Sequence, residues 1–237
     1  MKTYIKLFIL LACTTPLLAQ SFAVEGATLH LGNGQTIEKG ILLVENGKIA
    51  DIIDLGKPQT TRAEYTTVVE GNGLHLYPGF LLVNNIAGLT ETDAVRATLD
   101  YNETGPFTPE VRAGIAFNAA SRILPTLVQN GVLFVESTPK GGLVSGQSSV
   151  LRLNGKPWTQ AALSQEAALH VFWPDFSPER IEGDPAANKA WSKRSQLRKE
   201  RLQQLEETLA DAQAGRLGQA YDVWRKVISG EQLLMLH

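Results

Sequence analysis

The pattern of apolar and polar positions divides the chain into a β-rich first part and a mixed second part. Residues 22–31, 41–44 and 49–53 are short apolar runs that are separated by turns rich in Gly and Asn. An Asn-Gly pair between two apolar runs predicts a two-residue hairpin, because both turn residues need a positive φ. A Gly-Asn-Gly turn at 71–73 predicts a third hairpin. The pattern therefore indicates a small antiparallel sheet or sandwich.

Continuous apolar runs joined by helical segments follow Pro78-Gly79. Residues 80–83 and 131–137 are typical of strands buried on both faces of a parallel sheet. Residues 110–129 between them predict one helix, or two that are broken near Pro125. The order strand, helix, strand predicts a βαβ unit and an α/β domain. Further expected elements are a strand at 150–153 and helices at 160–170, 189–214 and 220–228.

The long helix expected at 189–214 is highly charged, with one narrow apolar stripe. Leu202, Leu205, Leu209 and Ala212 keep the spacing of three or four residues that places side chains on one helical face. We expect a solvated outer helix, and docking of a partner helix along the stripe is the alternative.

The first nineteen residues predict a secretory signal peptide. Lys2 and Lys6 precede an apolar stretch, and the small residues Ala19, Ser21 and Ala23 follow it. The stretch is too short for a membrane anchor, which needs roughly 20 apolar residues. We therefore expect an exported protein, periplasmic or secreted. Lipidation at Cys13 is the alternative, because residues 10–13 are similar to a lipobox.

The composition argues against some classes of chemistry and of binding partner. Cys13 is the only cysteine, so removal of the signal leaves no thiol nucleophile and no disulfide. The net charge of −2 argues against a nucleic-acid partner, which would be bound through its phosphates. No second segment is long and apolar enough to span a membrane.

The order of several short motifs resembles the amidohydrolase superfamily, closest to imidazolonepropionase-like and dihydroorotase-like members. The matching segments are 26–28, 38–40, 45–49 and 77–80, and the stretch up to residue 158 resembles exported members. The resemblance implies a signal peptide at 1–19 and a β-sandwich domain at 20–79. It also implies the first units of an incomplete TIM-type α/β barrel at 80–237. A whole barrel takes roughly 250 residues, so we expect a fragment.

The resemblance also implies a divalent metal, usually zinc, held by a His-x-His motif at the end of the first barrel strand. Such a metal lowers the pKa of a bound water molecule. Asn84 and Ile86 are expected at the two histidine positions. Because Ile86 has no lone pair and an Asn oxygen is a poor zinc ligand, the first half of that metal site is not supported here.

Other polar residues offer weaker candidates. Asp100 and Glu103 are acid–base candidates, with loop capping as the alternative. Ser145 and Gln147, in a Gly-rich stretch, are substrate-binding candidates, with a tight βα connection as the alternative. The four histidines are His30, His75, His170 and His237. No two of them have the spacing of a metal motif, so we expect His30 and His75 on a sheet surface and His170 in packing.

The resemblance predicts a metal-dependent hydrolase of non-peptide C–N bonds, in linear or cyclic amides, whose metal site is degraded. Its expected partners are a small amide-like substrate or other subunits in a homo- or hetero-oligomer. The alternative is a catalytically inactive amidohydrolase-like binding or assembly subunit.

The exported chain is expected to begin at Gln20. Cleavage after Ala23 would remove part of the first predicted strand, whereas cleavage after Ala19 keeps it whole. N-terminal sequencing of the exported protein should therefore start at Gln20. A mature chain that starts at Val24 would contradict this prediction.

Overall fold

The computed structural model describes residues 21–58, 67–92, 94–174 and 183–237. The chain divides into two compact units, the first ending at Pro78 and the second starting at Gly79. The expected signal peptide and the alternative lipidation site at Cys13 lie outside the described residues.

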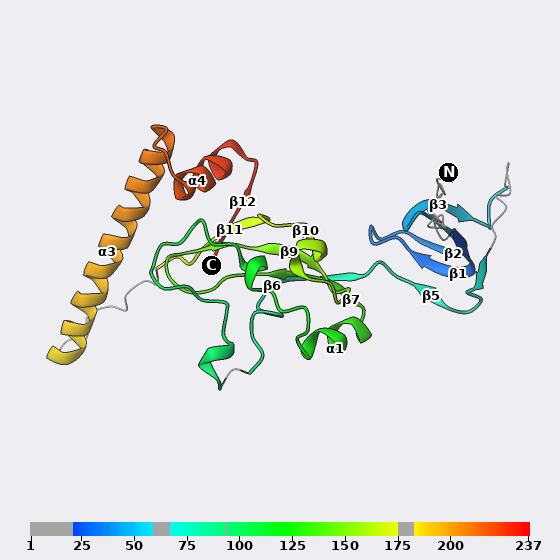
Figure 1. The fold of residues 1–237 in the computed structure, drawn as a ribbon, viewed down its shortest axis with the longest axis horizontal. Coiled ribbons are helices and arrows are strands. Elements are labelled where there is room, and N and C mark those ends of the chain that lie inside the picture. Colours follow the sequence, from blue (N-terminus) through cyan, green and yellow to red (C-terminus); the bar gives the residue numbers. More distant parts are fainter. Residues whose placement is uncertain (1–20, 59–66, 93, 175–182) are drawn as a thin grey trace, which may run out of the picture. The chain divides into compact units, whose positions relative to one another are not determined.

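The first unit holds five described strands in one sheet (Figure 1). They are β1 (Phe22–His30), β2 (Thr36–Glu45), β3 (Lys48–Asp54), β4 (Val68–Glu70) and β5 (His75–Leu76). The order is β3-β2-β1-β4, and β5 also pairs with β1. Ala23, Ile41 and Leu43 form the buried core of this unit, with Ile53 packed against them.

The first two expected hairpins are confirmed, and the third is wrong. β1, β2 and β3 pair antiparallel, and the turn residues Asn46 and Gly47 have φ of 54° and 71°. β4 and β5 instead both pair with β1 in parallel. The chain crosses close over β1 between them, since a Cβ at Gly71 would lie 2.8 Å from the Cβ of Ala27. The Gly-Asn-Gly turn thus interrupts one extended segment and does not reverse it.

The second unit is a mixed α/β arrangement. Its strands are β6 (Phe80–Asn85), β7 (Val132–Ser137), β8 (Val144–Gln147), β9 (Ser149–Arg152), β10 (Ala162–Ser164), β11 (Ala168–Val171) and β12 (Leu233–Leu236). Its α-helices are α1 (Ile123–Gln129), α2 (Trp158–Ala161), α3 (Pro185–Gln213) and α4 (Gln219–Ser229). Two short 3-10 turns, Arg96–Thr98 and Ala113–Ala116, lie in the connection between β6 and α1.

Four strands of this unit share one direction. β6 and β7 pair in parallel, as do β11 and β12. The consecutive strands β8 and β9 run antiparallel to β11 and β7 respectively, and so join the two parallel pairs. The expected β6-α1-β7 unit is therefore confirmed. The described strands form open sheets in which β6 and β12 are end strands, and they do not close into a barrel.

One helix prediction is confirmed only over its last residues, and another is wrong. Of residues 110–129, only Ile123–Gln129 is α-helical, because the backbone at Val111 accepts a hydrogen bond from Gln147 (2.7 Å) and the preceding chain bonds to β8. Residues 160–170 form the end of α2 and then β10 and β11, which pair with β9 and β8. In both places, tertiary strand pairing prevails over a helical pattern.

The strand over residues 80–83 is confirmed, but its expected burial on both faces is wrong. Phe80 is 61% exposed and Val83 is 59% exposed. β6 is an end strand with β7 as its only described neighbour.

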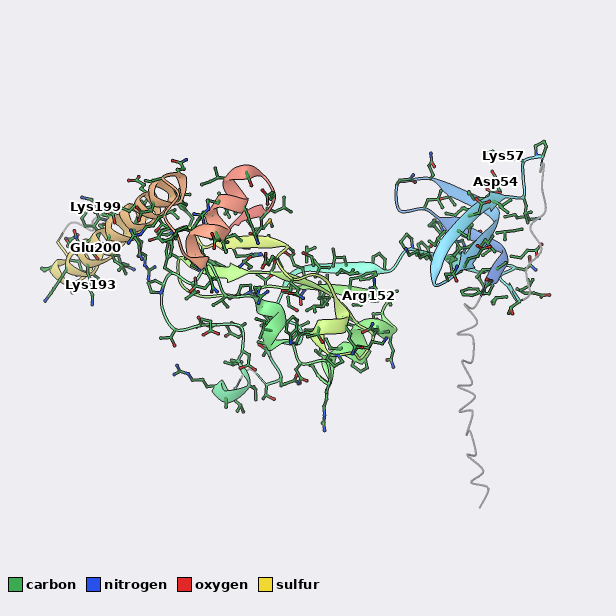
Figure 2. The ribbon with its side chains drawn as sticks, turned by 45° about the horizontal axis from the view of Figure 1, so that its top comes forward. Asp54, Lys57, Arg152, Lys193, Lys199 and Glu200 are labelled. Carbon is green, nitrogen blue, oxygen red and sulfur yellow. The ribbon has the colours of Figure 1, made fainter. Side chains whose placement is uncertain are left out.

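The two long helices pack on the sheet that contains β8, β11 and β12. The Asp184 carboxylate caps α3, with Pro185 at its first position. Leu205 and Ala212 of the predicted stripe are buried with Val223 and Trp224 of α4. Lys193, Lys199 and Glu200 of α3 are exposed, and in the first unit exposed Lys57 forms an ion pair with half-buried Asp54 (Figure 2). No helix among the described residues is both long and apolar enough to cross a bilayer.

Leu169 tests the packing of the second unit. Its side chain is fully buried beneath α3 and α4, so Leu169→Ala should lower the free energy of unfolding by about 2–5 kcal/mol. All four tryptophans belong to this unit, so fluorescence during urea unfolding reports on it. Leu217→Ala, at a position 87% exposed, is the matched control and should change stability little. Equal losses in the two variants would contradict this packing.

Candidate functional site

A buried polar cluster lies at the carboxyl ends of the parallel strands. It consists of Glu136, Ser148, His170 and His237, and is called the Glu136 cluster below. Glu136 is near the end of β7, His170 is near the end of β11, and His237 directly follows β12. Ser148 lies between β8 and β9. Because parallel strands bring their carboxyl ends to one edge, residues far apart in sequence meet there, where ligands of α/β folds commonly bind.

Glu136 is the charged centre of the cluster. Its carboxylate accepts hydrogen bonds from Ser148 Oγ (2.7 Å) and from the backbone N–H of Asn84 (3.1 Å). His170 Nε2 lies 3.6 Å from Glu136 Oε1, an ion-pair distance longer than an ordinary hydrogen bond. The contact with His170 is the main reason that the pKa of Glu136 falls from 4.5 to about 2, against the opposing effect of burial. Glu136 is therefore ionised at neutral pH.

The carboxylate determines where the protons of the two imidazoles lie. A negative oxygen beside His170 Nε2 favours a proton on that nitrogen, which leaves Nδ1 as an acceptor. His170 Nδ1 is 2.9 Å from His237 Nε2, so His237 donates this hydrogen bond. His237 Nδ1 is then the unprotonated nitrogen at the end of the chain Glu136–His170–His237.

His237 is the member of the cluster that solvent reaches. His170 and Ser148 are fully buried, whereas the His237 side chain is exposed. Phe172 stacks on its ring, with centroids 4.4 Å apart. Partial burial is the main reason that the pKa of His237 is lowered. The neutral imidazole is therefore favoured near pH 7 and has a lone pair for general-base work.

The strand β6 supports the cluster through its backbone. Asn84 has φ of 49°, a conformation that is uncommon for residues other than Gly, and its N–H points at Glu136. The Asn85 side chain donates to the backbone carbonyl of Glu136 (3.0 Å). At this strand end, where the resemblance expects histidines, a backbone donor serves the Glu136 carboxylate.

The residues of this edge do not fit a catalytic zinc. Such a site needs three protein ligands and a position for water. In the Glu136 cluster the carboxylate is occupied by Ser148 and Asn84, and His170 Nε2 faces that carboxylate. Within the described ranges, no group of three or more His, Cys, Asp or Glu residues is arranged to hold a metal ion.

The acid–base candidates Asp100 and Glu103 lie together, but away from this cluster. Both line a cavity of about 390 Å³ whose wall also includes Glu110, Arg112 and Gln219. The structure thus brings the two carboxylates to one hollow surface, where they remain candidates for binding a ligand.

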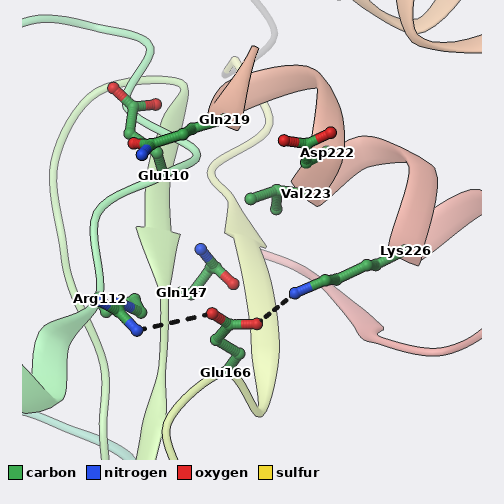
Figure 3. A pocket seen from close by; sticks show the side chains of 8 residues that line it. All are labelled: Glu110, Arg112, Gln147, Glu166, Gln219, Asp222, Val223 and Lys226. Carbon is green, nitrogen blue, oxygen red and sulfur yellow. Dashed lines mark hydrogen bonds and ion pairs between the residues drawn. The ribbon is translucent and has the colours of Figure 1, made fainter. Parts of the chain in front are cut away.

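The substrate-binding candidates Ser145 and Gln147 belong to a buried strand, β8, and not to an open loop. Ser145 Oγ donates to the backbone carbonyl of Gly141. Gln147 accepts from Gln232 (2.8 Å) and lines a polar cavity of about 290 Å³ next to α4 (Figure 3). In that cavity Glu166 forms ion pairs with Arg112 (3.7 Å) and Lys226 (2.5 Å). Successive side chains of an extended segment point to opposite faces, so Gln147 and Ser148 serve different sites.

Sequence reasoning missed most of the Glu136 cluster. The four histidines form two pairs in space, although their spacing along the chain indicates none: His170 with His237, and His30 with His75. Glu136 stands in the apolar run 131–137, and a carboxylate at the end of a strand expected to be buried is the signal that could have marked it.

The depressed pKa of Glu136 predicts an acid-sensitive fold. Its ionised form stabilises the folded state fully above pH 4.5, and this contribution is lost as the pH falls from 4.5 towards 2. Glu136→Gln should lower the free energy of unfolding at pH 7 by about 1–3 kcal/mol, and the difference from wild type should shrink towards pH 2.

Urea unfolding followed by tryptophan fluorescence at several pH values measures this dependence. Glu206→Gln, on the exposed side of α3, is the control and should follow wild type at every pH. If the free energies of unfolding of Glu136→Gln and wild type differ by the same amount at every pH, the ionised form of Glu136 does not stabilise the fold.

Comparison with solved structures gives a clear similarity of fold. No family model matches the chain, and no curated protein matches it. A solved structure, an amidohydrolase from Thermotoga maritima, is similar with a TM-score of 0.71 and 19% sequence identity. The match covers 91% of this chain and 57% of that one, so the chain spans little more than half of the solved protein. The resemblance expected from the sequence is thus confirmed at the level of structure: this chain has the fold of part of an amidohydrolase.

Proposed function

We propose that the chain is part of an exported amidohydrolase-superfamily enzyme that hydrolyses non-peptide C–N bonds in small linear or cyclic amides. In this proposal the first unit corresponds to the β-sandwich, and β6, β7, β11 and β12 correspond to strands of a TIM-type barrel. Export rests on the N-terminal signal pattern. The shared fold supports the assignment to the superfamily. The proposed hydrolysis has to be argued from the residues of the site, because one fold can carry many activities.

The single observation that carries the proposal is the chain of contacts from Glu136 through His170 to exposed His237. A buried carboxylate orients one imidazole, and that imidazole orients a second on the exposed residue His237. Hydrolysis of an amide requires a proton to be taken from the attacking water and a proton to be given to the leaving nitrogen. His237 has the lowered pKa and the accessible position for this transfer.

Glu136 and His170 act in this mechanism without touching substrate. When His237 takes a proton, the positive charge is shared through the hydrogen bond to His170 and stabilised by the Glu136 carboxylate. Ser148 and the Asn84 N–H hold that carboxylate in place. Because Ser148 is buried and bonds to a carboxylate, it is a positioning residue and not a nucleophile.

The alternative function is a catalytically inactive amidohydrolase-like binding or assembly subunit. It is favoured by the metal positions: Asn84 and Ile86 stand where histidines are expected, and the described residues offer no three-ligand group. Turnover separates the two proposals, because a binding subunit would hydrolyse nothing.

Substitution of His237 tests the enzyme proposal. His237→Asn cannot accept the proton, so hydrolysis of cyclic imides, lactams and dihydropyrimidines should fall by about 10²-fold or more in kcat/KM. Glu136→Gln should also lower kcat and change the pH profile of the reaction, because the negative charge that favours a proton on His170 Nε2 is removed. His75→Gln, in the first unit, is the control and should retain wild-type activity.

The outcomes of this assay separate the proposals. A folded wild-type protein that hydrolyses none of these amides would favour the binding subunit. Turnover that is unchanged in His237→Asn would overturn the assignment of the Glu136 cluster.

A further inference from the structure

The second histidine pair lies in the first unit, on one face of the sheet edge formed by β1 and β5. His30 ends β1, and His75 begins β5. Thr28 and His75 are directly opposed in the parallel register, so His30 and Tyr77 follow two residues further along the same face. This placement explains the contact between residues that are 45 positions apart in the chain.

The two imidazoles are spaced for chelation. His30 Nε2 lies 3.0 Å from His75 Nδ1. Two nitrogens bound to one metal at 2.0–2.1 Å, with an angle between 90° and the tetrahedral value, are about 2.9–3.3 Å apart. The observed separation falls in this range, so a metal ion could bind both nitrogens after a small turn of the rings.

The surroundings of His30 match those of a metal-bound histidine. Its other nitrogen, Nδ1, lies 3.3 Å from Thr36 Oγ1 across the β1–β2 pair. When Thr36 accepts this hydrogen bond, the proton is on Nδ1 and the Nε2 lone pair faces His75. Tyr77 stacks on the His30 ring at 4.1 Å with planes 5° apart, which restrains the ring's orientation.

Neither histidine of this pair is fully buried, whereas His170 of the other pair is. His75 and Tyr77 are exposed, so water molecules can complete the coordination of an ion held by two imidazoles. In the Glu136 cluster, His170 is fully buried.

We propose that His30 and His75 form a surface site for a divalent first-row transition metal ion, with Thr36 as a positioning residue. Imidazole ligands suit Cu²⁺, Ni²⁺ and Zn²⁺, and affinity should be highest for Cu²⁺. The ion would link β5, which is only two residues long, to β1, and so stabilise the edge of this sheet. The site is independent of the proposed hydrolase chemistry, because it lies in the other unit.

Titration of the untagged full chain with CuCl₂ by isothermal calorimetry, with glycine as a competitor, tests this site. Wild type should bind one equivalent of Cu²⁺ that both His30→Gln and His75→Gln lose. Thr36→Val keeps both ligands and should weaken binding about tenfold. His237→Asn is the matched control from the other histidine pair and should retain the equivalent.

Electron paramagnetic resonance of the Cu²⁺ complex gives a second readout, because nitrogen hyperfine structure from two imidazoles is expected. Circular dichroism checks that each variant is folded. Wild-type protein that binds no Cu²⁺, or stoichiometry that persists in His75→Gln, would overturn the proposal. Loss of the equivalent in His237→Asn alone would place the ion at the other pair and would also overturn it.

Discussion

The ionised carboxylate of Glu136 is the interaction on which the candidate site depends. A carboxylate that is only 8% exposed is costly unless hydrogen bonds and an opposite charge stabilise it. Here each stabilising group comes from a different strand or strand end: Asn84 from β6, Ser148 from the β8–β9 segment, and His170 from β11. The ionised carboxylate is therefore stable only when these strand ends lie together. Their contacts lower the pKa of Glu136 to about 2.

The same charge determines the direction of the two imidazoles. With Glu136 ionised, the proton of His170 belongs on Nε2, and the remaining nitrogen orients His237 through a 2.9 Å hydrogen bond. The buried Glu136 charge thus acts on His237 through the imidazole of His170. This arrangement differs from the zinc centre that the resemblance implies, although the fold is that of part of an amidohydrolase. Strand alternation separates this edge from the polar cavity near α4, since Gln147 and Ser148 point to opposite sides.

Short sequence patterns predicted the fold correctly where short-range interactions determine the structure. The Asn46-Gly47 turn, the β6-α1-β7 unit and the helix α3 all follow from short-range signals: positive φ, apolar runs and a helical stripe. Predictions failed where distant pairing decides the structure. Residues 160–170 have a helical pattern, yet they pair with β9 and β8 as strands.

The candidate site could not be predicted for the same reason. Its four members come from positions 136, 148, 170 and 237, and only the strand order brings them together. His30 and His75 meet because β5 joins β1 in parallel, whereas the sequence pattern favoured a hairpin there. By contrast, Asp100 and Glu103 lie close in sequence and line a common cavity, and their acid–base role stays a prediction.

The protonation of the histidine rings tests the central claim most directly. Nitrogen-15 NMR of the imidazole side chains at pH 7 distinguishes protonated from unprotonated nitrogens at each ring. The account predicts that His170 is protonated at Nε2 with Nδ1 accepting, that His237 is protonated at Nε2 with Nδ1 free, and that Glu136→Gln disturbs both patterns. A proton on His170 Nδ1, or patterns unchanged in Glu136→Gln, would contradict the claim that the Glu136 charge organises this site.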